Sequence, residues 1–287
     1  MPRTIDEGFN DFLQNLTPNK TESKAATSHR SSIEQCLRSN FSLRRFWRIG
    51  SFGNGTSISG YSDTDYLASL GDLTENSSYS LQKIKNVLAS RFPNTGVTVR
   101  CPAVKIPFGL LAKETTEVVP GELISVIPYH VYNIPDCSGG WMLTSPDAHN
   151  AYVRMINEKH NLKVKPLIRF IKAWKYYQDV PISSFYLEMR VARYCESENV
   201  IIYRLDIEYF LSRLLDANLP RLQDPTGISG YIQPCTSKTD FEVALSKLRT
   251  AVIRAQKANE AQKHDDLKAA FEWWNRLYKH KFPSFYK

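Results

Sequence analysis

The stretch at residues 50–70, GSFGNGTSISGYSDTDYLASL, decides the fold prediction for this chain. It places the pair Gly50-Ser51 ahead of two aspartates, Asp63 and Asp65, which open an apolar run. Residues i and i+2 of a β-strand point to the same face of a sheet. The two carboxylates are therefore predicted to project together, beside a glycine-rich turn.

The combination of a turn and two acids indicates a chemistry that neither part indicates alone. Two adjacent carboxylates repel each other and cost stability unless a cation lies between them. Oxygen ligands with no His or Cys nearby in the sequence favour Mg²⁺ over Zn²⁺. The Gly50-Ser51 turn offers backbone N–H groups and a hydroxyl to phosphate oxygens. Metal-dependent phosphoryl or nucleotidyl transfer requires both parts.

Composition is that of an ordinary globular protein. The 287 residues are 42% hydrophobic, enough for two medium domains or one large one, and the net charge of +8 suits a polyanionic ligand. No apolar run reaches the ~20 residues that span a bilayer, and the charged N-terminus is unlike a secretory signal. The scattered cysteines predict free thiols in a reducing cytoplasm: Cys36, Cys101, Cys137, Cys195 and Cys235.

Periodicity changes along the chain. Helical spacing is found at residues 5–16 and 80–92, and strand patterns are found at residues 46–52, 64–70, 97–108 and 122–134. After residue 145 almost every segment has helical periodicity, apart from a loop at 222–234. We predict an α+β fold with two domains, residues 1–145 containing the sheet and the N-terminal helix, and residues 146–287 helical.

The opening stretch resembles the signature GS-x4-T-x6-D-x-D of the nucleotidyltransferase superfamily that includes DNA polymerase beta and oligoadenylate synthase. Within it, the resemblance is closest to the bacterial cyclic-GMP-AMP-synthase-like enzymes, the CD-NTases of antiphage signalling. It implies a bilobal molecule in which a polymerase-beta-like core packs against a C-terminal helical domain. It also implies two Mg²⁺ ions, with Mn²⁺ as an alternative, held by the two aspartates. The matching residues are Gly50, Ser51, Thr56, Asp63 and Asp65.

Two later stretches resemble further family motifs. Residues 167–175, LIRFIKAWK, are similar to a helix whose K-x-W lysine reaches the triphosphate, which implies Lys172, with Arg169 or Lys175 as neighbouring candidates. Residues 181–189, PISSFYLEM, are similar to a segment in which a serine binds phosphate and an aromatic ring lies against the base. These roles map to Ser184 and to Phe185, or to Tyr186 if the register slips by one.

The family's third carboxylate is expected on a later strand, in a pattern like D-V-V-P or E-V-I-P. Counting about sixty residues past Asp65 places that pattern at Ser125-Val126-Ile127-Pro128, so Ser125 is predicted to stand where the third acid belongs. A hydroxyl is a poor Mg²⁺ ligand and cannot act as a carboxylate base. Glu122 would point to the opposite face of the strand unless a bulge intervenes, and Glu117 and Asp136 lie farther from the expected position.

The predicted function is magnesium-dependent synthesis of a cyclic di- or trinucleotide second messenger from nucleoside triphosphates, with release of pyrophosphate. The resemblance implies a cytoplasmic antiphage system with an effector protein that senses the product. It also implies an enzyme that requires neither a membrane nor a nucleic acid. Ser125 keeps a second hypothesis open, a non-catalytic nucleotide-binding or regulatory protein of the same fold. A third is a nucleotidyltransferase that tails RNA or modifies a small molecule.

Overall fold

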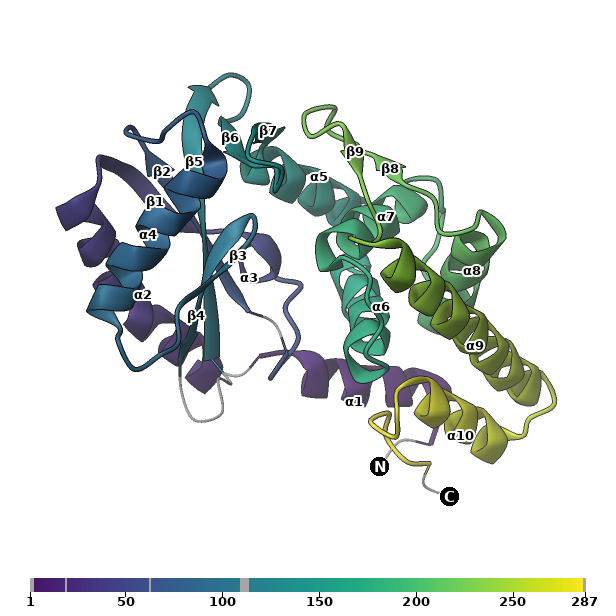
Figure 1. The fold of residues 1–287 in the computed structure, drawn as a ribbon. Helices are drawn as coiled ribbons and strands as arrows, with labels where there is room; N and C mark the ends of the chain where they lie inside the picture. Colours follow the sequence, from purple (N-terminus) through teal and green to yellow (C-terminus); the bar gives the residue numbers. More distant parts are fainter. Residues whose placement is uncertain (1–2, 19, 62, 109–113, 286–287) are drawn as a thin grey trace. The chain divides into compact units, whose positions relative to one another are not determined.

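A computed structural model describes residues 3–18, 20–61, 63–108 and 114–285 of the chain (Figure 1). The chain divides into two compact units. The sheet unit comprises Pro18–Ala151 with Thr226–Gly230, and the helical unit comprises Met1–Thr17, Tyr152–Pro225 and Tyr231–Lys287. Each unit is described separately below.

The sheet unit is built on a mixed sheet, which confirms the predicted fold class. The strand order is β1-β2-β5-β4-β3, with β6 paired to β5 and β7 paired to β6. β2 and β5 are parallel, whereas the other pairs of this sheet are antiparallel. The strands are β1 (Leu43–Arg48), β2 (Thr64–Leu70), β3 (Thr98–Arg100), β4 (Ala103–Phe108), β5 (Glu114–Ser125), β6 (Val131–Pro135) and β7 (Trp141–Thr144).

The two faces of this sheet bury different sets of side chains. Helices α2 (Lys20–Asn40) and α4 (Ser77–Arg91) cover one face, where Tyr66 of β2 and Val118 of β5 are fully buried among their apolar residues. Leu67 and Val119, one position along each strand, belong to a second cluster. Side chains alternate along a strand, so Asp65 and Glu117 lie on this second face.

The helical unit begins with α1 (Ile5–Leu16), which is closed by a capping box between Thr4 and Glu7. The ring centroid of Phe9 lies 5.1 Å from those of Phe170 and of Trp274. The N-terminal helix therefore packs in the helical unit, which corrects our assignment of it to the sheet-containing domain. The remaining helices are α6 (Val164–Tyr177), α7 (Ser184–Glu196), α8 (Tyr203–Asp216), α9 (Lys238–Lys263) and α10 (Leu267–Leu277).

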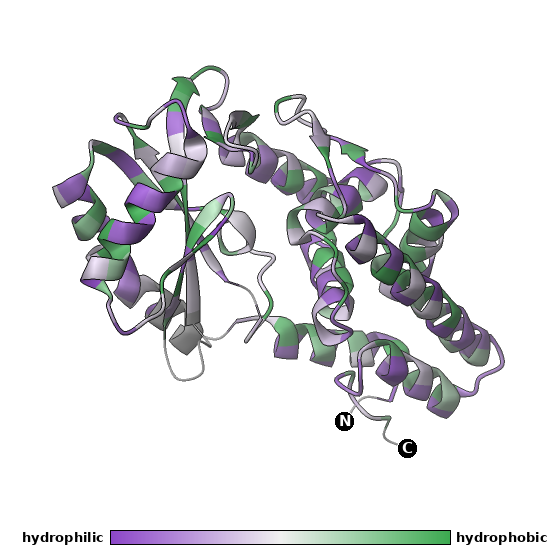
Figure 2. Ribbon diagram, viewed as in Figure 1, coloured by the Kyte–Doolittle hydropathy of each residue, from purple (hydrophilic) through white to green (hydrophobic). Residues whose placement is uncertain are grey.

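The boundary between the units falls inside a helix. The division between Ala151 and Tyr152 lies within α5 (Pro146–Lys159), a few residues beyond the expected boundary at 145 and 146. The predicted loop at 222–234 contains a small hairpin of β8 (Leu222–Gln223) and β9 (Tyr231–Ile232). The helices show alternating hydrophobic and hydrophilic bands, as amphipathic helices do (Figure 2).

The cysteines differ from the prediction of free thiols. Cys101, between β3 and β4, forms a disulfide with Cys137, which follows β6, with a Cα–Cα distance of 5.6 Å. Cys36, Cys195 and Cys235 are free. The two cysteines are 36 positions apart in the sequence, and the folding of the sheet brings them together.

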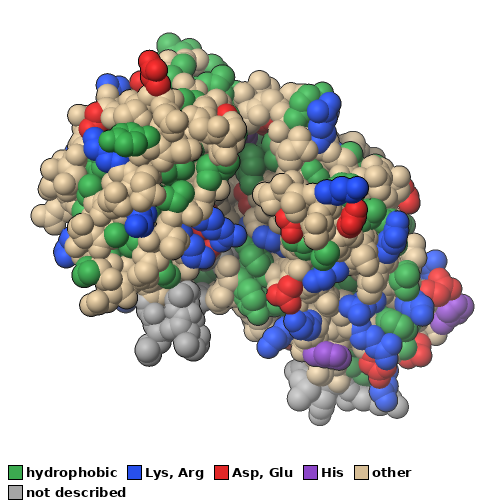
Figure 3. Space-filling view, in the orientation of Figure 1, with side chains coloured by type: hydrophobic (Ala, Val, Ile, Leu, Met, Phe, Trp, Pro, Cys, Tyr) green, Lys and Arg blue, Asp and Glu red, His purple; other side chains and the backbone are tan. Residues whose placement is uncertain are grey.

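Two surface properties bear on function. Among the described residues, no helix is long and apolar enough to cross a membrane. In the view of Figure 3, Lys and Arg side chains of the helical unit are interspersed with Asp and Glu and do not gather on one basic face.

Candidate active site

The glycine-rich stretch forms a short helix, α3 (Gly50–Asn54), between β1 and β2. Gly50 has φ +59°, and a Cβ placed there would lie 2.1 Å from Oδ2 of Asp65. The N–H of Ile49 donates to the carbonyl of Asp65 at 2.8 Å, which holds the start of α3 against β2. Only glycine fits at position 50, because any other residue would be strained at this φ and would carry a Cβ that clashes with Asp65.

The other signature residues close the same turn. The N–H of Thr56 donates to the carbonyl of Ser51 at 2.8 Å, and Gly55 ends α3 in the left-handed conformation at φ +70°. The side chain of Thr56 is fully buried, whereas Ser51 is half-buried. The buried Thr56 therefore stabilises the turn from inside the fold, and Ser51 is the hydroxyl that remains accessible to solvent.

Three carboxylates converge beside this turn. Asp65 lies in β2, and Asp63 lies one residue before the strand begins; both are half-buried. In the parallel pairing of β2 with β5, Asp65 is directly opposite Glu117. Burial raises the pKa of the Glu117 carboxyl above its ordinary value, and the negative charge of Asp63 raises it further. Sequence reasoning identified the two aspartates but not this glutamate.

Two cations partly offset this accumulation of negative charge. Nη1 of Arg100 lies 3.5 Å from Oε1 of Glu117. Lys105 of β4 is directly opposite Glu117 on the side away from Asp65. Both positive charges lower the pKa of Glu117, but burial and Asp63 outweigh them, because the net direction is upward.

Ser125 does not occupy the position of the third acid. It follows Glu117 by eight residues in β5, which at about 3.3 Å per residue separates them by about 26 Å. Ser125 is exposed, pairs with Val131 of β6, and its hydroxyl donates to the carbonyl of Ile127 at 3.4 Å. The assignment of the third position to Ser125 is therefore wrong.

A signal for Glu117 was present in the sequence. Residues 117–120 read Glu-Val-Val-Pro, which matches the expected pattern of an acid, two apolar residues and a proline. Residues 125–128 have a serine in the place of the acid. Our count of sixty residues overshot, and the predicted strand at 122–134 left out the first part of β5, which begins at Glu114. The register with β2 resolves the choice, because it sets Glu117 opposite Asp65.

The donor set suits a hard divalent cation in its chemistry. All three side chains offer carboxylate oxygens, the ligands that Mg²⁺ prefers, and their mutual repulsion is relieved by a cation. Within the described ranges, no group of three or more His, Cys, Asp or Glu side chains is placed so that it could hold a metal ion. Mg²⁺ is usually bound by one or two carboxylates together with substrate phosphates and water, so an incomplete set of carboxylates fits the chemistry of this ion.

Lys172 is not available to a triphosphate. Its side chain is fully buried, and its Nζ lies 3.5 Å from Oε2 of Glu188, whose side chain is only 8% exposed. The pair joins α6 to α7 inside the helical unit. The prediction that Lys172 binds phosphate is corrected, because the lysine carries a core ion pair.

The lysine one turn later has the expected partner. Nζ of Lys175 donates to Oγ of Ser184 at 2.6 Å, and the hydroxyl of Tyr176 lies 3.0 Å from the same oxygen. Ser184 and Lys175 are both half-buried. The structure thus brings Ser184 together with Lys175, the neighbouring candidate, and not with Lys172.

The two aromatic candidates differ in their exposure to solvent. Phe185 is 39% exposed, whereas Tyr186 is buried and donates its hydroxyl to the carbonyl of Pro220. Burial raises the pKa of Tyr186 to about 12. Phe185, the residue to which the unslipped register assigns the contact with a base, is therefore the more exposed member of the pair.

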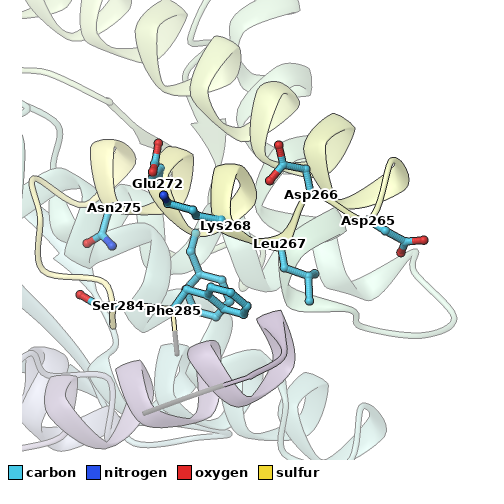
Figure 4. Close-up of a pocket in the computed structure, with 9 residues that line it drawn as sticks. Asp265, Asp266, Leu267, Lys268, Glu272, Asn275, Ser284 and Phe285 are labelled. Atoms are coloured by element: carbon cyan, nitrogen blue, oxygen red, sulfur yellow. The ribbon is translucent and has the colours of Figure 1, made fainter. Parts of the chain in front are cut away.

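The helical unit has a cavity that is not part of the predicted site. A cavity of about 730 Å³ lies against α10 and is lined by nine residues of the helical unit between Asp265 and Phe285 (Figure 4). None of the residues predicted from the sequence lines it. The carboxylate cluster is recognised by its chemistry and not by an enclosed volume.

Comparisons with known proteins identify the family of the chain. Residues 3–157 match the family of Second Messenger Oligonucleotide or Dinucleotide Synthetase domains. A probable cyclic nucleotide synthase of Bacillus cereus (strain VD146) is 26% identical over 254 residues, which cover 81% of this chain and 74% of that protein. A cyclic AMP-AMP-AMP synthase of an Acinetobacter strain is 23% identical, with 98% of this chain and 86% of that protein covered.

The fold has a solved counterpart. The structure of CdnC from Escherichia coli MS115-1 with ATP superimposes with a TM-score of 0.73 at 15% identity, over 97% of this chain and 98% of that chain. The family match covers more than half of the 287 residues and includes all three carboxylates. The chain therefore belongs to the Second Messenger Oligonucleotide or Dinucleotide Synthetase family and is a nucleotidyltransferase of the CD-NTase type.

Proposed function

We propose that this nucleotidyltransferase condenses nucleoside triphosphates into a cyclic di- or trinucleotide, in a magnesium-dependent reaction that releases pyrophosphate at each transfer. The observation that carries the proposal is the convergence of Asp63, Asp65 and Glu117 beside the Gly50 turn. The names of the two curated relatives support the cyclic product. Antiphage signalling through an effector protein that senses the product is proposed from the resemblance alone.

The chemistry assigns a role to each group of the sheet unit. Asp63, Asp65 and Glu117 would hold Mg²⁺, which when bound neutralises the triphosphate and favours ionisation of the attacking hydroxyl. Backbone N–H groups of the Gly50-Ser51 turn and the Ser51 hydroxyl would donate to the donor phosphates. A bond forms between the acceptor oxygen and the α-phosphorus, the bond from that phosphorus to the pyrophosphate oxygen breaks, and pyrophosphate leaves.

A carboxylate of this cluster would also take the proton of the attacking hydroxyl, and we assign that role to Glu117 of β5, which lies directly opposite Asp65. We assign the third carboxylate to Glu117, so Ser125 has no part in turnover in this proposal. This favours a catalytic protein over the non-catalytic regulator.

We propose that Lys175 and Ser184, and not Lys172, supply the phosphate contacts of the helical unit. Their hydrogen bond of 2.6 Å places a cation and a hydroxyl together, and a phosphate oxygen could accept from both. The exposed ring of Phe185, next to Ser184, would lie against a base. The bases themselves are left open.

The test is to incubate the purified protein with labelled nucleoside triphosphates, singly and in pairs, with Mg²⁺ and with EDTA. We expect magnesium-dependent pyrophosphate release and a phosphatase-resistant product whose mass identifies the ring. Asp63→Asn should abolish both, whereas Asp72→Asn, a change at an exposed aspartate after β2, should leave them intact. Nucleotide binding without pyrophosphate release would instead favour a regulatory protein, and elongation of an oligonucleotide primer would indicate RNA tailing.

A further inference from the structure

Two cations face the third carboxylate, and they differ in how firmly they are held. Lys105 is half-buried on β4, which pairs with β3 on one side and β5 on the other. Arg100 ends β3, a three-residue strand at the edge of the sheet, and its side chain is 65% exposed. The lysine lies opposite Glu117 inside the sheet, whereas the arginine side chain lies at the sheet edge with most of its surface in solvent.

The backbone on which Arg100 stands is nevertheless anchored. The next residue, Cys101, is bonded to Cys137, and Arg100 pairs in register with Ala103 across the turn between β3 and β4. The guanidinium thus reaches Glu117 on an exposed side chain that extends from an anchored backbone. Its interaction with Oε1 of Glu117 is the one ion pair and the one side-chain hydrogen bond of Arg100 that the described residues show.

A cation at this position satisfies the same requirement that a metal ion satisfies. Asp63, Asp65 and Glu117 repel one another when no cation lies between them, and a guanidinium at 3.5 Å relieves part of that repulsion. The same guanidinium occupies a carboxylate oxygen that a metal ion would coordinate. The Arg100 guanidinium and a metal ion would therefore compete for the Glu117 carboxylate.

We propose that Arg100 is a positioning residue that neutralises Glu117 until a divalent metal ion arrives and then releases it, so that Arg100 sets the metal concentration at which the site fills. Lys105 remains beside Glu117 in both states as a fixed counter-charge. This inference rests on the proposed function, because it assumes that the three carboxylates bind metal.

The experiment compares metal binding by the full-length protein and by Arg100→Gln. Mg²⁺ and Mn²⁺ are titrated, with binding followed by calorimetry and by the rise in melting temperature, which reports binding to the folded state. Removal of an exposed ion-pair partner should lower the half-saturating metal concentration about two- to fivefold. Arg249→Gln, a change at an exposed arginine of α9, removes the same charge and should leave this concentration unchanged.

A second comparison separates competition from a merely structural role. In metal-free buffer Arg100→Gln should melt below the wild type, and this difference should vanish at saturating Mg²⁺, because the metal replaces the guanidinium. In a Glu117→Gln background, Arg100→Gln should no longer alter the half-saturating concentration. Arg100→Lys, which keeps the charge, should resemble the wild type more than Arg100→Gln does.

The outcomes distinguish this inference from the function on which it rests. Equal or weaker metal binding by Arg100→Gln, with normal binding by the wild type, overturns the competition and leaves the proposed function intact. Absence of any metal-dependent stabilisation in the wild type, with or without nucleoside triphosphate, overturns both.

Discussion

The carboxylates of the sheet unit and the Lys172–Glu188 pair of the helical unit differ in how their charges are neutralised. In the sheet unit three like charges gather with partial access to solvent, and burial raises the pKa of Glu117. In the helical unit two opposite charges meet at 3.5 Å and are sealed in the core. A cluster of like charges that neighbouring cations only partly offset indicates a cation-binding site, whereas a buried pair of opposite charges indicates a structural role.

The comparison also explains why a motif lysine can mislead. Lys172 and Lys175 lie on the same helix, and both fall within the stretch that resembles the family motif. Lys172 is buried against Glu188, and Lys175 meets a serine hydroxyl. The role of each lysine follows from the partner that the fold supplies.

The largest effect is expected at the buried pair. Lys172→Met should lower the free energy of unfolding by about 3 kcal/mol, because it leaves the Glu188 carboxylate buried without its partner. Lys175→Met should cost about 1 kcal/mol but should reduce turnover. Urea denaturation measures the first effect and pyrophosphate release the second. Adding Glu188→Gln to Lys172→Met should recover most of the loss; failure to recover would mean that the pair is not coupled.

The next effect concerns the third carboxylate. Glu117→Gln should reduce the rate of pyrophosphate release about 100-fold or more while the protein stays folded, because it removes a charged ligand and a proton acceptor. Ser125→Ala should change the rate less than about twofold, and Ser125→Glu should not raise it. Steady-state assays at saturating Mg²⁺ check both. A large loss in Ser125→Ala would contradict the register that sets Glu117 opposite Asp65.

A smaller effect is expected at the turn. Gly50→Ala should destabilise the protein by about 2 kcal/mol and reduce activity, because it adds backbone strain and a carbon 2.1 Å from Oδ2 of Asp65. Gly96→Ala is the matched control, since Gly96 has φ +68° with nothing within 4 Å of the added carbon. It should show the strain alone, about 1 kcal/mol, with normal activity. Equal losses in both variants would show that the contact with Asp65 is unimportant. Melting curves and the pyrophosphate assay measure the two quantities.

Much of the site could be predicted because its parts are local in sequence. The strand at 64–70 and the helix at 5–16 were predicted with the bounds observed, and the turn at Gly50 lies where its glycines indicated. Asp63 and Asp65 were recognised as partners because alternation along a single strand is a property of that strand. The mixed sheet followed from the order of helical and extended patterns.

The remaining features depend on which distant segments lie together. The pairing of β2 with β5 makes Glu117, and not Ser125, the neighbour of Asp65. The packing of α6 on α7 buries Lys172 and leaves Lys175 with Ser184, and the sheet brings Cys101 to Cys137. Local spacing determined that Asp63 and Asp65 lie together beside a turn, because backbone geometry fixes the relation of residues i and i+2. Only the tertiary structure set Glu117 opposite Asp65 and Lys175 beside Ser184, because strand register and helix packing are set by contacts between residues far apart in sequence.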